Sequence, residues 1–302
     1  MKTVLISGGT GLVGSYLCEM LHMAGYSVRI LSRKENINSK FKTFLWDYQN
    51  KKVDSSAFKD VDYVINMAGA GIIDKRWSQK RKQEIIDSRV ETTKFLFETI
   101  QKENTSLIAF ISASAIGYYG TVTDLHIFKE DDTAGNDFLG NTCKQWEDAA
   151  DMFSKTNNRV VKIRIGVVLS KRGGALEKMA LPIRLGLASA IGSGKQFFPW
   201  IHIEDLCRMF IYSMENKELS GAYNAVAPEH IDNKSFTKAI AKALNKPIWL
   251  PNIPSSFLNL VMGKQAKLLL KGSRISSEKI QSTGFRFEYP DLASALHNLL
   301  KK

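Results

Sequence analysis

The sequence contains few residues of the kinds that build covalent cross-links or membrane spans. Only three of its 302 residues are cysteines, at positions 18, 143 and 207. They are too few for a disulfide framework or a four-cysteine zinc site, so we expect a reducing, cytoplasmic location. No apolar run approaches the length of about 20 residues that spans a bilayer, and the first strand leaves no room for a signal peptide. We therefore expect no membrane association.

Acidic residues are scarce relative to basic ones. The chain has 42 Lys and Arg against 30 Asp and Glu, which gives a formal net charge of +12 and a pI of about 9.5. The basic residues are spread along the sequence, and no helix-turn-helix, zinc-finger or RNA-binding signature accompanies them. We predict no nucleic-acid partner and attribute the charge to solubility and to attraction for an anionic cofactor.

An apolar strand near the N-terminus runs directly into three glycines spaced by two residues. Gly8 permits the positive φ needed to leave the strand, Gly11 has no Cβ to block a pyrophosphate, and Gly14 lets the following helix pack on the sheet. Amides at the start of that helix, near Leu12, point toward the anion, and the helix dipole assists. The pattern predicts a dinucleotide site. The residues expected to form it are Gly8, Thr10, Gly11, Leu12, Val13 and Gly14.

The end of the second expected strand, at residues 27–31, indicates which dinucleotide binds. Sites that prefer NAD carry an acidic residue there, but this chain reads Ser32-Arg33-Lys34 and has no carboxylate before Glu35. A guanidinium forms paired hydrogen bonds with a 2′-phosphate, and a neighbouring hydroxyl adds one. We therefore predict NADP(H), bound by Ser32 and Arg33. The alternative is that Arg33 and Lys34 are solvated surface charges.

Strands and helices alternate as far as residue 170, which predicts an α/β fold built on a Rossmann-type doubly wound parallel sheet. After Gly173 and Gly174 the elements become short and most of the prolines appear. We expect an NADP-binding domain at residues 1–170, with segments around 195–230 returning to it. Residues 171–302 would mainly form a smaller, mixed C-terminal lobe. Further strands are expected at 41–47, 62–67, 107–112 and 160–165, and long helices at 78–102 and 141–153.

Four motifs occur along the chain: residues 8–14, 66–69 (Asn-Met-Ala-Gly), 112–120 (Ser-Ala-Ser-Ala-Ile-Gly-Tyr-Tyr-Gly) and 200–205 (Trp-Ile-His-Ile-Glu-Asp). Together they resemble the extended short-chain dehydrogenase/reductase superfamily of nucleotide-sugar epimerases and dehydratases. The segments 74–77, 87–89, 146–147 and 270–274 resemble an atypical branch, the NAD(P)-dependent epimerase family proteins with a DUF1731-type C-terminus, here from about residue 248. The resemblance covers essentially the whole chain. It implies a C-terminal lobe that closes over a small-molecule substrate of unknown identity.

The small residues after the strand at 62–67 let backbone lie close to a cofactor, and the resemblance implies contacts further along. The residues expected to contact the cofactor here are Met67, Ala68, Gly69, Glu84, Arg89 and Val168. Val168 would lie in a loop that closes over the nicotinamide. Arg89 would meet a phosphate or ribose, although it could instead pair with Asp87 or Glu91 at the surface.

Typical members of the superfamily use a Tyr-x-x-x-Lys pair on the helix after the fifth strand, and this chain lacks a complete one. Counting four residues back from Lys144 reaches Gly140. If the helix is registered on Glu147 instead, Cys143 and Leu139 occupy the lysine and tyrosine positions. The residues leave both registers open.

The remaining hydroxyls lie at the tip of the fifth strand. By resemblance, Ser114 matches the catalytic Ser/Thr position, and Tyr118 and Tyr119 match a Tyr-Gly element. We predict a catalytic group of Ser114, Tyr118 and Lys144, because a tyrosine can act as acid or base only when a nearby cation stabilises its phenolate. The alternatives are that the tyrosine rings only cover the end of the sheet, and that Cys143 is a nucleophile rather than a small buried residue.

Other polar residues carry weaker expectations. The spacing of His202, Glu204 and Asp205 offers no completed ligand set, so we predict no metal. In the C-terminal lobe, Arg274 could bind an anion and Trp77 or Trp200 could stack on a ring, or all could be ordinary surface and core residues. The resemblance implies a homodimer through the helices at 78–102 and 141–153. Phe95 and Phe97 favour it, because one of them must face away from the sheet.

Two functions fit these residues. The first is an NADP(H)-binding oxidoreductase or epimerase that acts on a carbonyl or sugar-type substrate. The second is a non-catalytic NADP(H)-binding sensor or scaffold, which the incomplete Tyr-x-x-x-Lys pair favours.

Overall fold

The computed structural model describes residues 1–34, 39–123 and 125–301. An eight-stranded sheet runs through the larger part of the molecule in the order β11-β8-β6-β5-β1-β2-β3-β4. All neighbours are parallel except β3 and β4. The predicted doubly wound α/β fold is confirmed. The strands of this sheet are β1 (Thr3–Ser7), β2 (Ser27–Ser32), β3 (Lys42–Asp47), β4 (Lys52–Val53), β5 (Tyr63–Asn66), β6 (Ala109–Ala115), β8 (Arg159–Ile165) and β11 (Gly221–Ala225).

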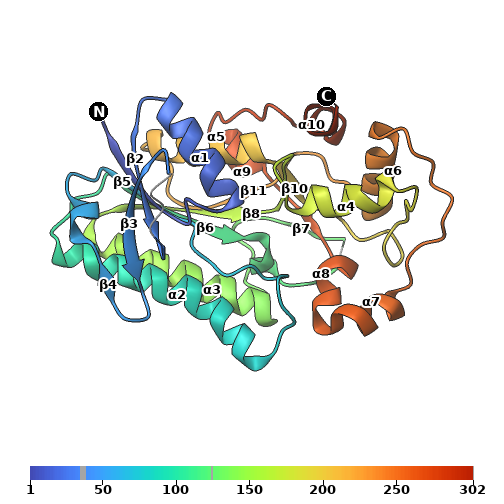
Figure 1. The fold of residues 1–302 in the computed structure, drawn as a ribbon, viewed down its shortest axis with the longest axis horizontal. Coiled ribbons are helices and arrows are strands. Elements are labelled where there is room, and N and C mark those ends of the chain that lie inside the picture. Colours follow the sequence, from blue (N-terminus) through green and yellow to red (C-terminus); the bar gives the residue numbers. More distant parts are fainter. Residues whose placement is uncertain (35–38, 124, 302) are drawn as a thin grey trace.

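Helices cover both faces of the sheet, with α1 and α5 on one face and α2 and α3 on the other (Figure 1). Their bounds are α1 (Leu12–Met23), α2 (Gln79–Lys102), α3 (Phe138–Ala150) and α5 (Ile203–Glu215). Every residue of β1 is buried, which is what a strand covered on both faces requires and explains its unbroken apolar sequence. Short 3₁₀ helices η1 (Ser55–Phe58), η2 (Ile116–Tyr119) and η3 (Asp151–Thr156) join these elements.

Phe95 and Phe97 of α2 correct one expectation. Phe95 stacks on Trp46, and Phe97 meets Phe153 edge to face with 5.2 Å between ring centroids. Both rings therefore pack against the core between the sheet and α2. The argument that a ring facing away from the sheet supports an interface does not hold, because Phe97, which meets η3 rather than a strand, is covered by the same chain. A homodimer stays a prediction without that argument.

The remaining elements form a smaller lobe at the end of the molecule away from the N-terminus (Figure 1). Its helices are α4 (Ala175–Arg184), α6 (Asn233–Ala243), α7 (Ser255–Met262), η4 (Gly263–Ala266), α8 (Lys267–Leu270) and α10 (Leu292–Leu300), while α9 (Glu278–Ser282) packs near β11. A separate apolar core joins α4, α6 and α10. Between α4 and α6 the chain returns to the sheet, where α5 packs on α1 and β11 pairs with β8 at the edge.

Two short parallel ribbons connect the two parts: β9 (Val167–Leu169) with β10 (Trp200–His202), and β7 (Ile127–Phe128) with β12 (Arg274–Ile275). Val168 therefore lies in a strand rather than in the expected loop, because its backbone pairs with Ile201. Among the described residues, no helix is both long enough and apolar enough to cross a membrane.

Candidate functional site

The turn between β1 and α1 has the geometry that its glycines predict. Gly8 has a φ of +77°, and a Cβ there would lie 2.8 Å from the carbonyl carbon of Met67. A Cβ on Gly14 would overlap the carbonyl oxygen of Gly8. Because α1 rests directly against the turn, only glycine fits at these two positions.

The N-terminus of α1 is open for an anion. Gly11 is its N-cap residue and offers no side chain to satisfy the first helical amides, and no acidic residue lies in the first turn. Thr10 and Gly11 are exposed, and Leu12 and Val13 are half-buried. Free amides at a helix start attract negative charge. The cradle therefore fits the pyrophosphate of a dinucleotide, held by the turn residues predicted above.

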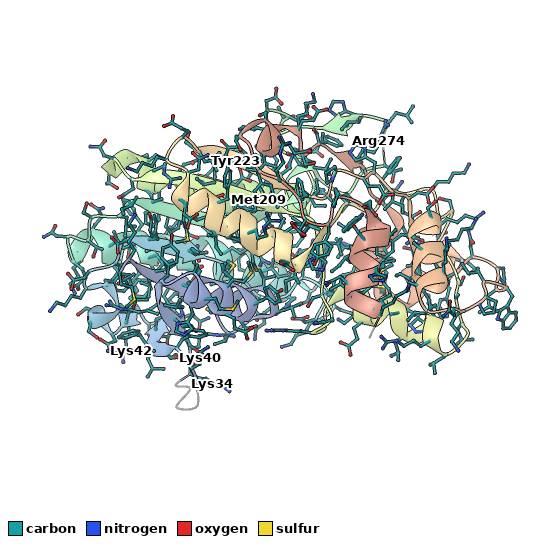
Figure 2. The ribbon with its side chains drawn as sticks, turned by 90° about the horizontal axis from the view of Figure 1, so that it is seen from above. Lys34, Lys40, Lys42, Met209, Tyr223 and Arg274 are labelled. Atoms are coloured by element: carbon teal, nitrogen blue, oxygen red, sulfur yellow. The ribbon has the colours of Figure 1, made fainter. Side chains whose placement is uncertain are left out.

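The basic residues Arg33 and Lys34 directly follow the end of β2, where they were expected. Ser32 is half-buried, and its Oγ accepts a hydrogen bond from the amide of Lys34. Arg33 and Lys34 are exposed, and Figure 2 shows Lys34 and Lys40 at the same margin of the molecule. Glu35 lies outside the described residues. No described carboxylate forms an ion pair with Arg33, so its guanidinium remains able to meet a 2′-phosphate.

Arg89 points at the backbone that follows β5. Its guanidinium would touch a Cβ on Gly69 at 3.1 Å, donates to the carbonyl of Ile85 and lies 5.2 Å from the ring of Trp146. Burial lowers the pKa of Arg89, because its guanidinium loses contact with water and no described carboxylate pairs with it. A cation in such surroundings suits an anionic or hydroxyl-rich ligand, as predicted.

The surface alternative for Arg89 has no geometric support. Its proposed partners are engaged elsewhere, because Asp87 accepts from Gln83 at 2.7 Å and Glu91 pairs with Lys94 at 2.9 Å. The indole Nε1 of Trp146, beside Arg89, is buried and has no hydrogen-bond partner among the described residues. Orphaned buried donors of this kind call for an acceptor.

Glu84 lies on α2 more than one turn before Arg89 and already has a partner. Its carboxylate pairs with Arg81 at 2.8 Å. The pKa of Glu84 lies below its usual value, chiefly through that hydrogen bond, with smaller contributions from the charges of Lys75 and Arg33. Arg81 also donates to the carbonyl of Gly71. Glu84 thus helps to hold the loop after β5 and is a weaker candidate for direct cofactor contact.

Helix α3 decides between the two registers that the sequence left open. Leu139, Cys143 and Glu147 are buried, whereas the side chain of Lys144 is 56% exposed and pairs with Asp148 at 2.7 Å. The inward positions four residues apart are therefore leucine and cysteine. Lys144 points to solvent, so the structure does not bring it to Ser114 as the predicted catalytic group requires.

Cys143 is an unreactive thiol. Burial raises its pKa to about 12, even though the charge of Arg89 acts in the opposite direction. A nucleophilic cysteine needs a depressed pKa so that thiolate is present near neutrality. The interpretation of Cys143 as a small buried residue is the one the geometry supports.

Ser114 belongs to a buried polar network that includes two residues not selected from the sequence. Its hydroxyl donates to Glu147 at 2.7 Å, and Arg164 of β8 holds the same carboxylate through two hydrogen bonds of 2.8 and 3.0 Å. All three residues are at most 5% exposed. A buried bidentate pair keeps both charges and fixes the orientation of its partners. Ser114 is thus held rigidly beneath the end of β6.

The two tyrosines after β6 differ in what they can do. Tyr119 is buried, donates to Asn224 and accepts from Arg164. Burial raises its pKa, and Arg164 offsets this only in part, so its proton stays in place. Tyr118 is half-buried, and the guanidinium carbon of Arg164 lies 3.5 Å from its ring centroid. The cation in contact with both rings is therefore Arg164, whereas Lys144 interacts with Tyr118 only through its charge.

One sequence signal points to Arg164. In β8 the residues at positions 162 and 164 are basic, while their neighbours at 161, 163 and 165 are aliphatic. Alternation of this kind places both cations on one face of a strand. Because that face is covered by α3 in a doubly wound fold, a buried partner was to be expected there, and Glu147 provides it.

His202 and Asp205 brace the two parts of the chain. His202 caps α5 by accepting from the amide of Glu204, and its other ring nitrogen meets Asn298 of α10. Asp205 accepts from the backbone amides of Glu288 and Tyr289. Within the described residues, no cluster of His, Cys, Asp or Glu is arranged to hold a metal ion.

His202 makes the stability of the protein depend on pH. Burial lowers the pKa of His202 from 6.5 to about 4. As the pH falls, this histidine therefore becomes protonated in the unfolded chain before it does in the folded protein. The free energy of unfolding is therefore unaffected by this group above pH 6.5, and it falls by about 3 kcal/mol as the pH is lowered toward 4. We expect urea unfolding at a series of pH values to show this loss in the parent protein and not in His202→Asn, which retains a helix cap. Parallel stability profiles for the two proteins would contradict the assignment.

The candidate substrate residues Trp77, Trp200 and Arg274 differ in their surroundings. Trp200 is fully buried in the core of the lobe, so it is not available to stack on a ligand. Trp77 is half-buried, donates to the carbonyl of Ile72 and meets Phe138 edge to face. Arg274 donates to the carbonyl of Leu125 and covers Phe197. Of these side chains, only Trp77 borders the loop after β5 and thus the predicted cofactor edge.

Comparisons with known proteins agree with this geometry. Residues 4–226 match the NAD dependent epimerase/dehydratase family, and residues 253–299 match the domain of unknown function DUF1731. The chain is 36% identical over 298 residues to the epimerase family protein YfhF of Bacillus subtilis (strain 168), covering 98% of this chain and 97% of that protein. The crystal structure of human epimerase family protein SDR39U1 (isoform 2) with NADPH is 34% identical, covers 98% of each chain and has a TM-score of 0.87. A UDP-N-acetylglucosamine 4-epimerase from Bacillus cereus, 20% identical over 99% of this chain and 98% of that chain, shares the fold with a TM-score of 0.80.

Proposed function

Because the chain belongs to the NAD dependent epimerase/dehydratase family and carries a C-terminal DUF1731 region, we propose that it is an NADP(H)-dependent oxidoreductase or epimerase. Its substrate would be a small carbonyl or sugar-type molecule. The observation that carries the proposal is the β1–α1 turn, where Gly8 and Gly14 admit no Cβ and α1 begins with uncapped amides. Such a turn suits a pyrophosphate.

The preference for NADP(H) rests on the tip of β2. Arg33 is exposed there with no described ion-pair partner, and Ser32 precedes it. The human relative named above was crystallised with NADPH, which agrees with this preference. Arg89 beside Gly69 would contact the ribose or phosphate of the same cofactor. When bound, the cofactor supplies or accepts a hydride at C4 of its nicotinamide ring.

The residues of this chain would bind and orient the substrate rather than provide a strong base. Ser114 donates its proton to Glu147, which leaves its lone pairs to accept from a substrate hydroxyl. Tyr118 is half-buried beside the cationic Arg164 and is the hydroxyl that could exchange a proton with a substrate oxygen. Tyr119 keeps its proton and serves the network.

Loss of Arg33 tests the proposal directly. We expect Arg33→Ala to weaken NADPH binding by roughly 10- to 100-fold, because charge-assisted hydrogen bonds contribute about 1.5–3 kcal/mol. NADH binding should not change, since NADH has no 2′-phosphate. Titration calorimetry with both nucleotides measures this, and Lys59→Ala, an exposed cation on another edge, is the matched control. If NADPH neither binds nor raises the melting temperature of the parent protein, the proposal fails.

A second function, a non-catalytic NADP(H) sensor or scaffold, is favoured by one observation. The positions of the Tyr-x-x-x-Lys pair face inward as Leu139 and Cys143, and the neighbouring Lys144 is exposed. A structure with NADPH bound separates the two functions. Ser114 or Tyr118 within hydrogen-bond reach of the nicotinamide C4 region supports the enzyme, and apolar groups alone around C4 support the sensor.

A further inference from the structure

The excess positive charge of the protein is confined to the C-terminal lobe. Residues 171–200 and 233–277 contain 13 of the 42 basic residues and one of the 30 acidic residues, so 29 of each remain in the rest of the chain. The segment 233–277 has no Asp or Glu at all. The basic residues are spread along the whole sequence, but acidic residues are nearly absent from these two segments. These two segments of the lobe carry a net charge of +12, and the charges of the rest of the chain balance.

The same lobe exposes large apolar side chains. Phe257, Leu260 and Val261 lie on one side of α7 and are 57%, 78% and 56% exposed, while Leu258 faces inward and is buried. Leu260 is the most exposed of them, yet α7 is held in place by a hydrogen bond from Arg76 to its carbonyl. Folding requires only the inner side of this helix to be apolar.

Further apolar residues lie next to α7 along the backbone. Trp249 is 67% exposed, and its indole donates to the carbonyl of Gly186, between Leu185 (69%) and Leu187 (51%). The chain from Trp249 then pairs with residues 189–192 through Ile253 and enters α7. Exposed apolar side chains gathered in one lobe in this way indicate an interaction site.

Exposed lysines flank these residues in the sequence. Lys264, Lys267 and Lys271 follow α7 and Lys246 precedes Trp249; all four are exposed and none forms an ion pair with a described residue. Figure 1 shows α7 and α8 together at the end of the molecule farthest from the N-terminus. We define the basic apolar face as this group of side chains, which comprises Leu185, Leu187, Trp249, Phe257, Leu260, Val261, Lys246, Lys264, Lys267 and Lys271.

We propose that the basic apolar face docks the protein onto the surface of an anionic lipid bilayer. Aromatic and aliphatic side chains would enter the boundary between headgroups and acyl chains, and the lysines would contact anionic headgroups. The expectation of no membrane association rested on the lack of a spanning run. That lack concerns insertion across a bilayer and does not bear on binding at its surface.

The charges favour a bilayer over the other occupants. A second copy of the chain would bring the four lysines of this face against the same four lysines across a two-fold axis. A nucleic acid would satisfy the lysines but would leave Leu260 and Val261 without an apolar partner. An anionic bilayer complements both kinds of side chain at once.

Vesicle flotation of the full chain tests the proposal. We expect binding to phosphatidylcholine vesicles that contain about one third phosphatidylglycerol, much weaker binding to phosphatidylcholine alone, and a blue shift of tryptophan fluorescence that Trp249→Phe removes. The double variants Leu260→Ser/Val261→Ser and Lys264→Glu/Lys267→Glu should each reduce binding by roughly tenfold or more. All these residues are exposed, so the variants should melt at the temperature of the parent protein.

Matched controls separate this face from general stickiness. Met23→Ser removes an apolar side chain on α1 that is 77% exposed, and Lys59→Glu/Lys155→Glu removes the same charge from exposed sites outside the lobe. Both should bind vesicles like the parent protein. The proposal is overturned by equal binding of all variants or by no binding to anionic vesicles. It is also overturned if light scattering shows a dimer that Leu260→Ser/Val261→Ser dissociates, or if the lysines bind RNA and not vesicles.

Discussion

Replacing Arg164 with methionine is expected to destabilise the fold by about 3–5 kcal/mol, because the carboxylate of Glu147 would be left buried without a counter-charge. Arg164 and Glu147 are 3% and 5% exposed and share two hydrogen bonds. Burial opposes the charged form of Arg164, but the bonds and charge of Glu147 more than offset this and raise its pKa. The free energy of unfolding from urea titration measures the loss.

Two further variants show whether the loss comes from the stranded charge. Glu147→Gln/Arg164→Met removes both charges and keeps an acceptor for Ser114, so it should be more stable than Arg164→Met alone. Lys144→Met breaks the solvent-exposed pair with Asp148 on the same helix and should leave the free energy of unfolding nearly unchanged. If the double variant is no more stable than Arg164→Met, the buried charge is not the cause.

Gly14→Ala is expected to abolish measurable NADPH binding, a loss of roughly 100-fold or more, which corresponds to about 2.7 kcal/mol. The new Cβ would overlap the carbonyl oxygen of Gly8 and lie 2.7 Å from the Cα of Gly9. Backbone cannot yield as a flexible side chain does, so α1 must move away from the turn. Its N-terminal amides would then miss the pyrophosphate. Titration calorimetry with NADPH gives the affinity.

Gly25→Ala is the matched control for this substitution. Gly25 follows α1 in the same strand-helix-strand unit with a φ of +85°, but nothing lies within 4 Å of its added Cβ. Its variant should cost about 1 kcal/mol of stability through backbone strain and leave NADPH affinity intact. Unchanged NADPH affinity in Gly14→Ala would remove the β1–α1 turn as the basis of the cofactor proposal.

Local patterns in the sequence predicted the elements of the sheet well. The helix expected at 78–102 is α2 at Gln79–Lys102, and the strand expected at 160–165 is β8 at Arg159–Ile165. These agree because periodicity, capping residues and glycine turns act over a few neighbouring residues. Val168 was misplaced in a loop because β9 forms only by pairing with β10, more than 30 residues later.

The register of α3 and the polar network could not be read from the sequence. Lys144 and Cys143 are adjacent, and a helix rotated by one residue would bring either of them to the site. Packing decides, since Leu139, Cys143 and Glu147 all fit against β6 and η2. Arg164, Glu147 and Tyr119 come from three separate elements, so no local spacing links them.

The sequence by itself determined the family, the parallel α/β sheet and the turn that fits a dinucleotide, because each depends on residues adjacent in the chain. Only the tertiary structure decided that Lys144 faces solvent, that Arg164 contacts the tyrosine rings, and that apolar residues are exposed in the lobe that carries the charge excess. These features depend on which segments meet in space. An exposed charged side chain keeps its contact with water, whereas a buried one needs an opposite charge or hydrogen bonds from the protein.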